Sequence, residues 1–246
     1  MSVKVLHSHA EIEKSRFVMD DRKISCLSTR ESKTDEFLKK IQRKLRIGKP
    51  SDAIAVGDVL KSWDVLLTIE FIEERFKNNA SILDIGAFAS EVICSLHKIG
   101  YKNLFAVDLN QKVKKMPFSD NINYVISDFM HTPFPNDFFD VVTATSVIEH
   151  DFKPDSLLRE MSRLIKKGGY FIASTDYWQD KIDTKNQRIF DMDWLIFSEK
   201  EIRDFINLAK KYGFSMEGEA DFNVKDKVIH CMNQNYTFIW LSLKKD

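Results

Sequence analysis

The sequence lacks the features that mark several classes of protein. Its three cysteines, Cys26, Cys94 and Cys231, lie far apart, with no CxxC pair and no Cys/His cluster at zinc spacing. Such an unpatterned count is typical of reduced thiols in a cytoplasmic protein. Basic and acidic residues balance at 37 each, whereas nucleic-acid-binding proteins usually carry a basic excess. The longest uncharged run that leans apolar, 228–243, is interrupted by polar residues and falls short of a membrane span. We therefore expect a cytoplasmic protein that neither spans a membrane nor binds nucleic acid.

The first 79 residues are predicted to form a helical extension. Within them Phe37, Ile41 and Leu45 recur every four residues among lysines and arginines, a spacing that predicts an amphipathic helix. A second helix is predicted over residues 60–77. The extension would either cap a site or form the contact of a homodimer.

From residue 80 onward, short apolar runs alternate with segments of helical periodicity. This alternation predicts right-handed βαβ units and an α/β, Rossmann-like sheet of seven mainly parallel strands, in a domain over residues 80–246. In such sheets, ligands bind beyond the carboxyl ends of the strands, where the strand order reverses. Strands are predicted at 81–86, 103–109, 121–127, 138–145, 170–175, 214–222 and 235–243, and helices at 90–100, 155–169 and 198–214.

The turn after the first predicted strand resembles a nucleotide-binding turn that has lost glycines. Asp84 and Gly86 are present, but Phe88 and Ser90 stand where two further glycines are expected. Glycine is needed where φ is positive or where the backbone nearly touches a ligand. We therefore expect Phe88 to have ordinary dihedral angles and Ser90 to cap the next helix. The alternative is a weakened cofactor site.

Acidic residues follow the next two predicted strands. Asp108 comes twenty-two residues after Gly86, the interval of an acid that accepts hydrogen bonds from ribose hydroxyls. Asp128 suits an adenine amino group, and neighbouring Phe129 offers an apolar ring surface. Each aspartate alone also has a structural interpretation, because strand ends often carry Asp as a turn former.

Five segments together resemble the class I S-adenosylmethionine-dependent methyltransferases, in order and in spacing. They are LDIG (83–86), VDLN (107–110), SDFMHTPFPNDFFDVV (127–142), SVIEH (146–150) and LLREMSRLIKKGGYFIAST (157–175). The resemblance implies an antiparallel last strand and S-adenosylmethionine as cofactor. It also implies a set of cofactor-binding residues: Asp84, Gly86, Ala87, Phe88, Asp108, Leu109, Asp128, Phe129 and Thr145.

Candidate catalytic residues follow the fourth and fifth predicted strands. Methyl transfer to a hydroxyl is a direct displacement that depends on positioning and on a base. His150 and Asp176 are the favoured bases, ahead of Glu149 and His131. Alternatively, His150 braces the following helix, Asp176 forms a turn, or both join Glu149 around a divalent cation. The prediction is that no metal is bound.

Residues 176–197 form a long insertion, predicted to act as a lid. Its aromatic residues, Tyr177, Trp178, Phe190 and Trp194, would either pack on a sugar or anchor the loop to the core. The segment beginning STDYW resembles methyltransferases found with bacterial glycan-building enzymes. This resemblance implies O-methylation of a small sugar or nucleotide-sugar acceptor.

Two other functions fit part of the pattern. An NAD-dependent oxidoreductase would share the glycine turn and the ribose acid but leave Asp128 without a purpose. A methyltransferase-like, non-catalytic binding or scaffold protein is the alternative that Phe88 suggests.

Overall fold

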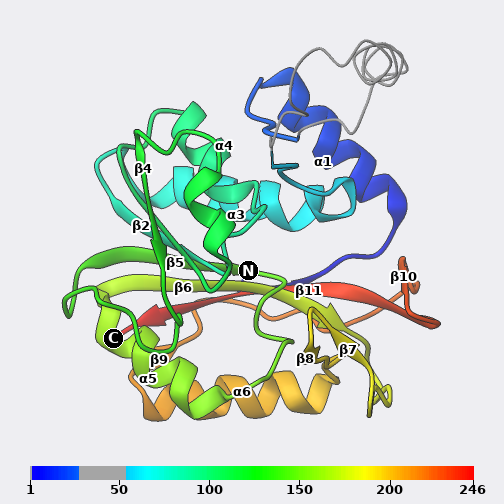
Figure 1. Ribbon diagram of the computed structural model, residues 1–246. Helices are drawn as coiled ribbons and strands as arrows, with labels where there is room; N and C mark the ends of the chain where they lie inside the picture. The colour runs from blue at the N-terminus through cyan, green and yellow to red at the C-terminus, as the bar shows by residue number, and fades with distance from the viewer. Residues whose placement is uncertain (1, 28–53) are drawn as a thin grey trace, which may run out of the picture.

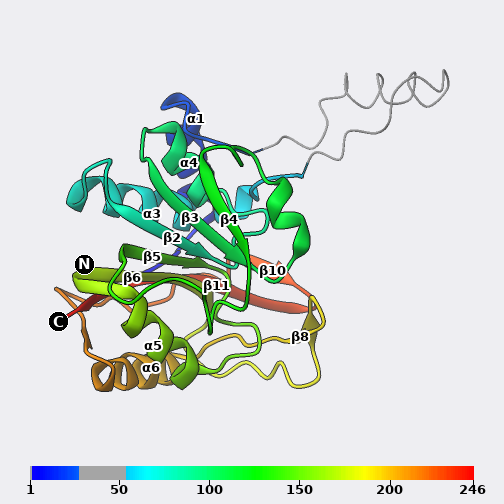
Figure 2. The same ribbon diagram turned by 60° about the vertical axis from the view of Figure 1, so that its left-hand side comes forward.

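The structure, a computed structural model, describes residues 2–27 and 54–246. A single large sheet lies between two layers of helices (Figures 1 and 2). The predicted helix that contains Phe37, Ile41 and Leu45 lies outside the described residues. One layer holds α1 (His9–Asp21), α3 (Ser62–Arg75) and α4 (Val92–Lys98), and the other holds α5 (Pro154–Leu164) and α6 (Glu199–Lys211).

The main path of the sheet has seven strands, in the order β1–β11–β6–β5–β2–β3–β4. The chain passes from β2 outward to β3 and β4, then returns to β5 and β6 on the other side, so the order reverses between β2 and β5. Strands β2 to β6 pair in parallel, and β11 pairs antiparallel with β6. The predicted fold class is thereby confirmed. The strands are β1 (Val3–Val5), β2 (Ser81–Ile85), β3 (Asn103–Asp108), β4 (Ile122–Ile126), β5 (Phe139–Thr145), β6 (Ile165–Tyr177) and β11 (Gln234–Lys245).

Side chains of the central strands are buried on both faces of the sheet. Ile82 belongs to the apolar cluster on the α3–α4 side, and Leu83 belongs to the cluster on the α5–α6 side. Both side chains are completely buried, and each such burial contributes about 2 kcal/mol. This double burial explains why the strands read as nearly continuous apolar runs in the sequence.

The prediction of a strand over 214–222 was largely wrong. Only Phe214–Ser215 forms a strand, β9, which pairs with the end of β11. The remaining place beside β11 is taken by β1, whose Val3 and Val5 are 0% and 3% exposed. Residues 217–220 are exposed and offer the sheet no apolar face. A segment of the predicted N-terminal extension is therefore a strand of the main sheet, while the domain boundary at residue 80 stays a prediction.

The helix predicted over 155–169 ends earlier than expected. Ile165 is fully buried with extended backbone and begins β6, so the two following glycines lie inside a strand. A Cβ on Gly169 would lie 2.6 Å from the carbonyl oxygen of Asp140. The glycine therefore permits the close approach of β5 and β6 rather than ending a helix.

Other local predictions are confirmed. The 60–77 helix appears as the short η1 (Val59–Lys61) followed by α3, and Ser198 and Glu201 form the capping box of α6. Within the 176–197 insertion, β7 (Arg188–Ile189) and β8 (Met192–Asp193) form a short hairpin. In the described part of the chain, every helix is too short or too polar to cross a membrane.

Candidate functional site

Gly86 follows β2 at the point where the strand order reverses. Its φ is +62°, and a Cβ on it would lie 2.4 Å from Cγ2 of Val147, in the turn after β5. A side chain is therefore excluded both by the backbone conformation and by the neighbouring turn. Ala87, the next residue, is fully buried, and its N–H donates to the carbonyl of Val107 on β3.

The turn tolerates Phe88 because the left-handed conformation falls on another residue. Ala89 has a φ of +64°, whereas Phe88 is not among the residues with positive φ. The Phe88 ring is half-buried and packs against the core on the α3–α4 side. The expectation of ordinary dihedral angles at Phe88 is confirmed.

The expectation that Ser90 caps α4 was wrong. The N-cap residue is Glu91, whose side chain makes no capping hydrogen bond. The Ser90 hydroxyl instead lies close enough to Asp84 to lower the pKa of that carboxyl. No hydrogen bond with good geometry joins the two groups.

Asp84 places a carboxylate at the base of the turn. It is 1% exposed, and its Oδ1 accepts a hydrogen bond from the Thr143 hydroxyl at 2.7 Å. Among the described residues, its Oδ2 is buried with no hydrogen-bond partner. The pKa of Asp84 is raised to about 6, mainly by burial; the Ser90 and Thr143 hydroxyls oppose this increase, and the charge of Asp108 adds a smaller contribution to it. A buried, unpaired oxygen beside a glycine turn is a group that a bound ligand would satisfy.

Asp108 ties the end of β3 to the glycine turn. Its Oδ2 accepts from the Phe88 N–H at 2.9 Å and its Oδ1 from the Asn110 N–H at 2.7 Å. The half-buried carboxylate therefore lies at the same edge of the sheet as Gly86, as the sequence predicts. Next to it, the side chain of Leu109 is 63% exposed.

The remaining predicted cofactor residues lie at the ends of β4 and β5. Asp128 is 51% exposed, accepts from the Met130 N–H at 2.8 Å and lies 3.9 Å from His131. Phe129 is half-buried and packs against the α5–α6 core, and Thr145 is half-buried as the last residue of β5.

Glu149 and His150, which follow β5, come together with Asp176, which lies near the carboxyl end of β6. Glu149 is 1% exposed and accepts from the Thr175 hydroxyl at 3.0 Å. Asp176 is 5% exposed and accepts from Nε1 of Trp194 at 2.8 Å. His150 is half-buried, and its Nδ1 has no partner in the described chain. We use the name acidic cluster for three carboxylates and the two basic side chains beside them: Asp64, Glu149 and Asp176, with Lys61 and His150. Lys61 and Asp64 are described next.

Sequence reasoning missed two members of the acidic cluster. Lys61, from η1, donates to the Ser146 hydroxyl, lies 4.0 Å from Oδ2 of Asp64 and stands 3.2 Å from the Phe238 ring centroid. Asp64 is fully buried and accepts from the Ser174 hydroxyl at 2.7 Å. The one available signal was an aspartate on the buried face of a predicted helix.

Burial moves the titrations of Glu149 and Asp176 toward neutral pH. The pKa of Asp176 is raised to about 7 and that of Glu149 to about 6, in both cases mainly by burial, and the charge of Glu149 contributes to the increase at Asp176. Lys61 opposes both increases. Burial lowers the pKa of His150, and the charge of Asp176 offsets part of this effect. Carboxylates that titrate near neutral pH can accept a proton from a hydroxyl that is being methylated.

A cavity of 410 Å³ opens beside the acidic cluster. Its lining is Glu149, Asp151, Phe152, Lys153, Asp193, Trp194 and Leu195. In the same insertion, Trp194 and Tyr177 are buried and so anchor the loop, whereas Phe190 is 80% exposed, with its ring 5.7 Å from that of His150. His131, the fourth candidate base, is 80% exposed and lies beside Asp128.

The acidic cluster does not form a metal centre. Within residues 2–27 and 54–246, no three His, Cys, Asp or Glu side chains are placed to hold a metal ion. The cation alternative for Glu149, His150 and Asp176 therefore has no geometric support.

Residues 83–173 match a family of proteins described as the methyltransferase domain. The chain is 35% identical over 63 residues to the ubiquinone/menaquinone biosynthesis C-methyltransferase UbiE of Pectobacterium atrosepticum, covering 26% of this chain and 25% of that protein. It is 30% identical to a ubiquinone biosynthesis O-methyltransferase of Hydrogenovibrio crunogenus, covering 44% of this chain and 48% of that protein. The chain thus spans less than half the length of these curated relatives.

Solved structures agree on the architecture. A SAM-dependent methyltransferase from Methanosarcina mazei aligns with 71% of this chain and 96% of its own, with a TM-score of 0.54 at 15% identity. The strand order and the antiparallel last strand define a class I, Rossmann-like methyltransferase fold. Residues 83–173 therefore match the methyltransferase domain, and the fold is shared with a protein described as a SAM-dependent methyltransferase.

Proposed function

We propose that the chain transfers a methyl group from S-adenosylmethionine to a hydroxyl of a small-molecule acceptor. One observation carries the proposal. The glycine turn with Asp108 ends β2 and β3, and the acidic cluster containing Glu149 and Asp176 ends the neighbouring β5 and β6. A donor site and a proton-accepting site would then lie side by side at the reversal of the strand order.

The residues around the turn fit the methyl donor. Asp84 offers a buried oxygen without a partner, and Gly86 leaves the backbone free of a side chain. We assign the ribose hydroxyls to Asp108, whose carboxylate can accept hydrogen bonds at the edge of the sheet. Adenine would lie between Asp128, Phe129 and the exposed Leu109. The methionine moiety would pass Gly86, Ala87 and Phe88 toward Thr145.

When bound, S-adenosylmethionine supplies a methyl group on a positively charged sulfur. The chain would hold the acceptor hydroxyl in line with that group, and much of the acceleration would come from this positioning. Asp176 is our first candidate to take the hydroxyl proton, because its raised pKa of about 7 leaves it basic enough at neutral pH. His150, whose Nδ1 is unpartnered, is the second candidate, and Glu149 would share the proton with Asp176.

Two classes of acceptor fit the site. A sugar or nucleotide sugar stays a prediction, and burial of Tyr177 and Trp194 removes two of the four aromatic faces that suggested it. An apolar aromatic acceptor is the second candidate, because Phe190 is exposed beside His150 and because the two curated relatives described above are named for ubiquinone biosynthesis. A homodimer and a cytoplasmic location also stay predictions.

Calorimetry with S-adenosylmethionine, S-adenosylhomocysteine and NAD tests the donor. We expect binding of the first two ligands and none of NAD. Mass spectrometry of products from nucleotide sugars and from hydroxylated quinol-like rings then tests the acceptor, with a gain of one methyl group on oxygen as the expected result. Binding of NAD alone would favour an oxidoreductase, and binding of none of the three would favour the scaffold alternative.

A further inference from the structure

A buried carboxylate stands directly behind the glycine turn. Glu91 is the N-cap residue of α4, two residues after Ala89, and its side chain is 1% exposed. Its Oε1 accepts from the backbone N–H groups of Cys26 and Leu27 at 2.8 and 2.9 Å. The carboxylate therefore connects the cofactor turn to the N-terminal part of the chain.

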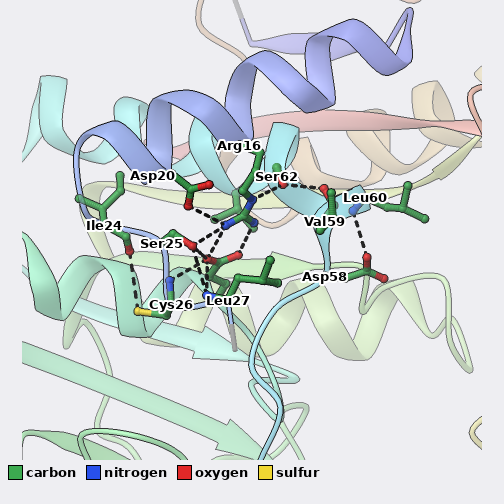
Figure 3. A network of polar contacts seen from close by, with 12 residues as sticks. Arg16, Asp20, Ile24, Ser25, Cys26, Leu27, Asp58, Val59, Leu60 and Ser62 are labelled. Carbon is green, nitrogen blue, oxygen red and sulfur yellow. Dashed lines mark hydrogen bonds and ion pairs between the residues drawn. The ribbon is translucent and has the colours of Figure 1, made fainter. Parts of the chain in front are cut away.

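Arg16, on α1, neutralises this carboxylate. It donates to both oxygens of Glu91, at 3.0 and 2.8 Å, and its other donors reach the hydroxyls of Ser25 and Ser62 (Figure 3). The Arg16 side chain is only 11% exposed. A two-pronged, buried contact of this kind fixes the geometry of both partners.

The same part of the chain also holds the turn through its backbone. The N–H of Gly57 donates to the carbonyl of Ala89 at 2.8 Å. A Cβ on Gly57 would lie 2.8 Å from Oε2 of Glu91. The backbone at Gly57 therefore lies in close contact with both Ala89 and Glu91. Ala89, whose φ is +64°, is therefore held by a hydrogen bond from a segment outside the turn.

We propose that Arg16 is a positioning residue for the cofactor turn, acting through Glu91 to keep Ala89 in the left-handed conformation. The turn lacks the glycines that would adopt this shape freely, and a residue with a Cβ disfavours it. Contacts from the N-terminal part of the chain supply the missing constraint. The inference rests on the proposed function, because it assumes that the methyl donor binds at this turn.

The first test measures binding of S-adenosylhomocysteine by calorimetry. Arg16→Met releases the turn, and the binding-competent fraction falls, so we expect the Kd to rise about tenfold. Arg22→Met is the matched control. Like Arg16, Arg22 pairs with a glutamate, but this partner, Glu73 of α3, lies at the surface. This control should change the Kd less than about twofold.

A second substitution separates positioning from general damage. Ala89→Gly removes the conformational penalty, so adding it to Arg16→Met should restore most of the lost affinity. If Arg16→Met does not fold because Glu91 is left buried and unpaired, the double variant Arg16→Met/Glu91→Met removes both charges and should show the same loss. Unchanged affinity in a folded variant, or no rescue by Ala89→Gly, would overturn the proposal.

Hydrogen exchange of the ligand-free protein tests the same idea without the cofactor. The amides of residues 87–91 should exchange faster in Arg16→Met than in the wild type, and at the wild-type rate in Arg22→Met. Equal exchange in all three proteins would contradict the positioning role. A wild-type protein that binds no S-adenosylhomocysteine but shows the expected exchange pattern would refute the proposed function alone.

Discussion

Replacing Asp176 by Asn should make the protein more stable at pH 8 and less active. Asp176 is 5% exposed, and its pKa is raised from the usual 3.8 to about 7, first by burial and then by Glu149. Between these two pH values the folded protein binds a proton that the unfolded chain has lost. The free energy of unfolding therefore falls as pH rises through this interval, and it stays low above pH 7.

The magnitude follows from the size of the pKa change. At about 1.4 kcal/mol per pKa unit, ionised Asp176 costs the folded protein about 4 kcal/mol well above pH 7, and about 2 kcal/mol of this develops between pH 5 and pH 7. Asn does not ionise, and its carbonyl can still accept from Nε1 of Trp194. The lowered pKa of His150 acts in the opposite direction in both proteins, because its charging on unfolding adds stability as pH rises.

Urea unfolding at pH 5, 6, 7 and 8 measures the difference. The advantage of Asp176→Asn over the wild type should grow by about 3 kcal/mol from pH 5 to pH 8. Asp180→Asn, the same substitution at an exposed residue of the same insertion, should leave the free energy of unfolding within about 0.5 kcal/mol of the wild type. A constant difference between Asp176→Asn and the wild type across this range would refute the account of the buried charge.

Three further predictions concern the donor turn and the acidic cluster. Asp108→Ala should abolish binding of S-adenosylmethionine in calorimetry, and unchanged affinity would remove Asp108 from the site. Gly86→Ala should lower the free energy of unfolding by about 2–4 kcal/mol in urea, because its Cβ would meet Val147 and its φ is positive; adding Val147→Ala should recover part of the loss. Lys61→Met should move the acidic limb of the pH–rate profile to higher pH, since Lys61 lowers the pKa of Asp176; a shift to lower pH would contradict this.

Local chemistry accounts for the parts of the fold that the sequence predicts well. Ser198 and Glu201 satisfy the free amides at the start of α6 within four residues, so the capping box is legible without tertiary information. The apolar runs that become β2 and β3 can also be predicted from the local sequence, since strands buried on both faces need few polar residues. The order of strands and helices then places Gly86, Asp108 and Glu149 at one edge of the sheet.

Features that depend on distant contacts were not predictable in this way. Strand β1 has only three residues, too few for a period, and its place is decided by β11 more than 230 residues further along the chain. Lys61 and Asp64 join the acidic cluster only because α3 packs across the sheet near β6. The predicted end of the helix at residue 169 was wrong, and α5 ends at Leu164, because a double glycine has the same appearance after a helix and inside a bulged strand.

The buried carboxylates of the acidic cluster destabilise the folded protein when they are charged, and this effect favours an enzyme over a scaffold with the same fold. A fold of this kind hosts many functions, so the architecture alone does not decide between them. Asp64, Glu149 and Asp176 are all buried, and burial raises the pKa of each, which means that their charged forms destabilise the folded protein. A binding scaffold would be more stable with neutral side chains at these positions. Ionisable groups kept at that cost, at the carboxyl ends of β5 and β6, fit a site that takes and returns protons, and so the gain in stability expected for Asp176→Asn should be accompanied by a loss of turnover.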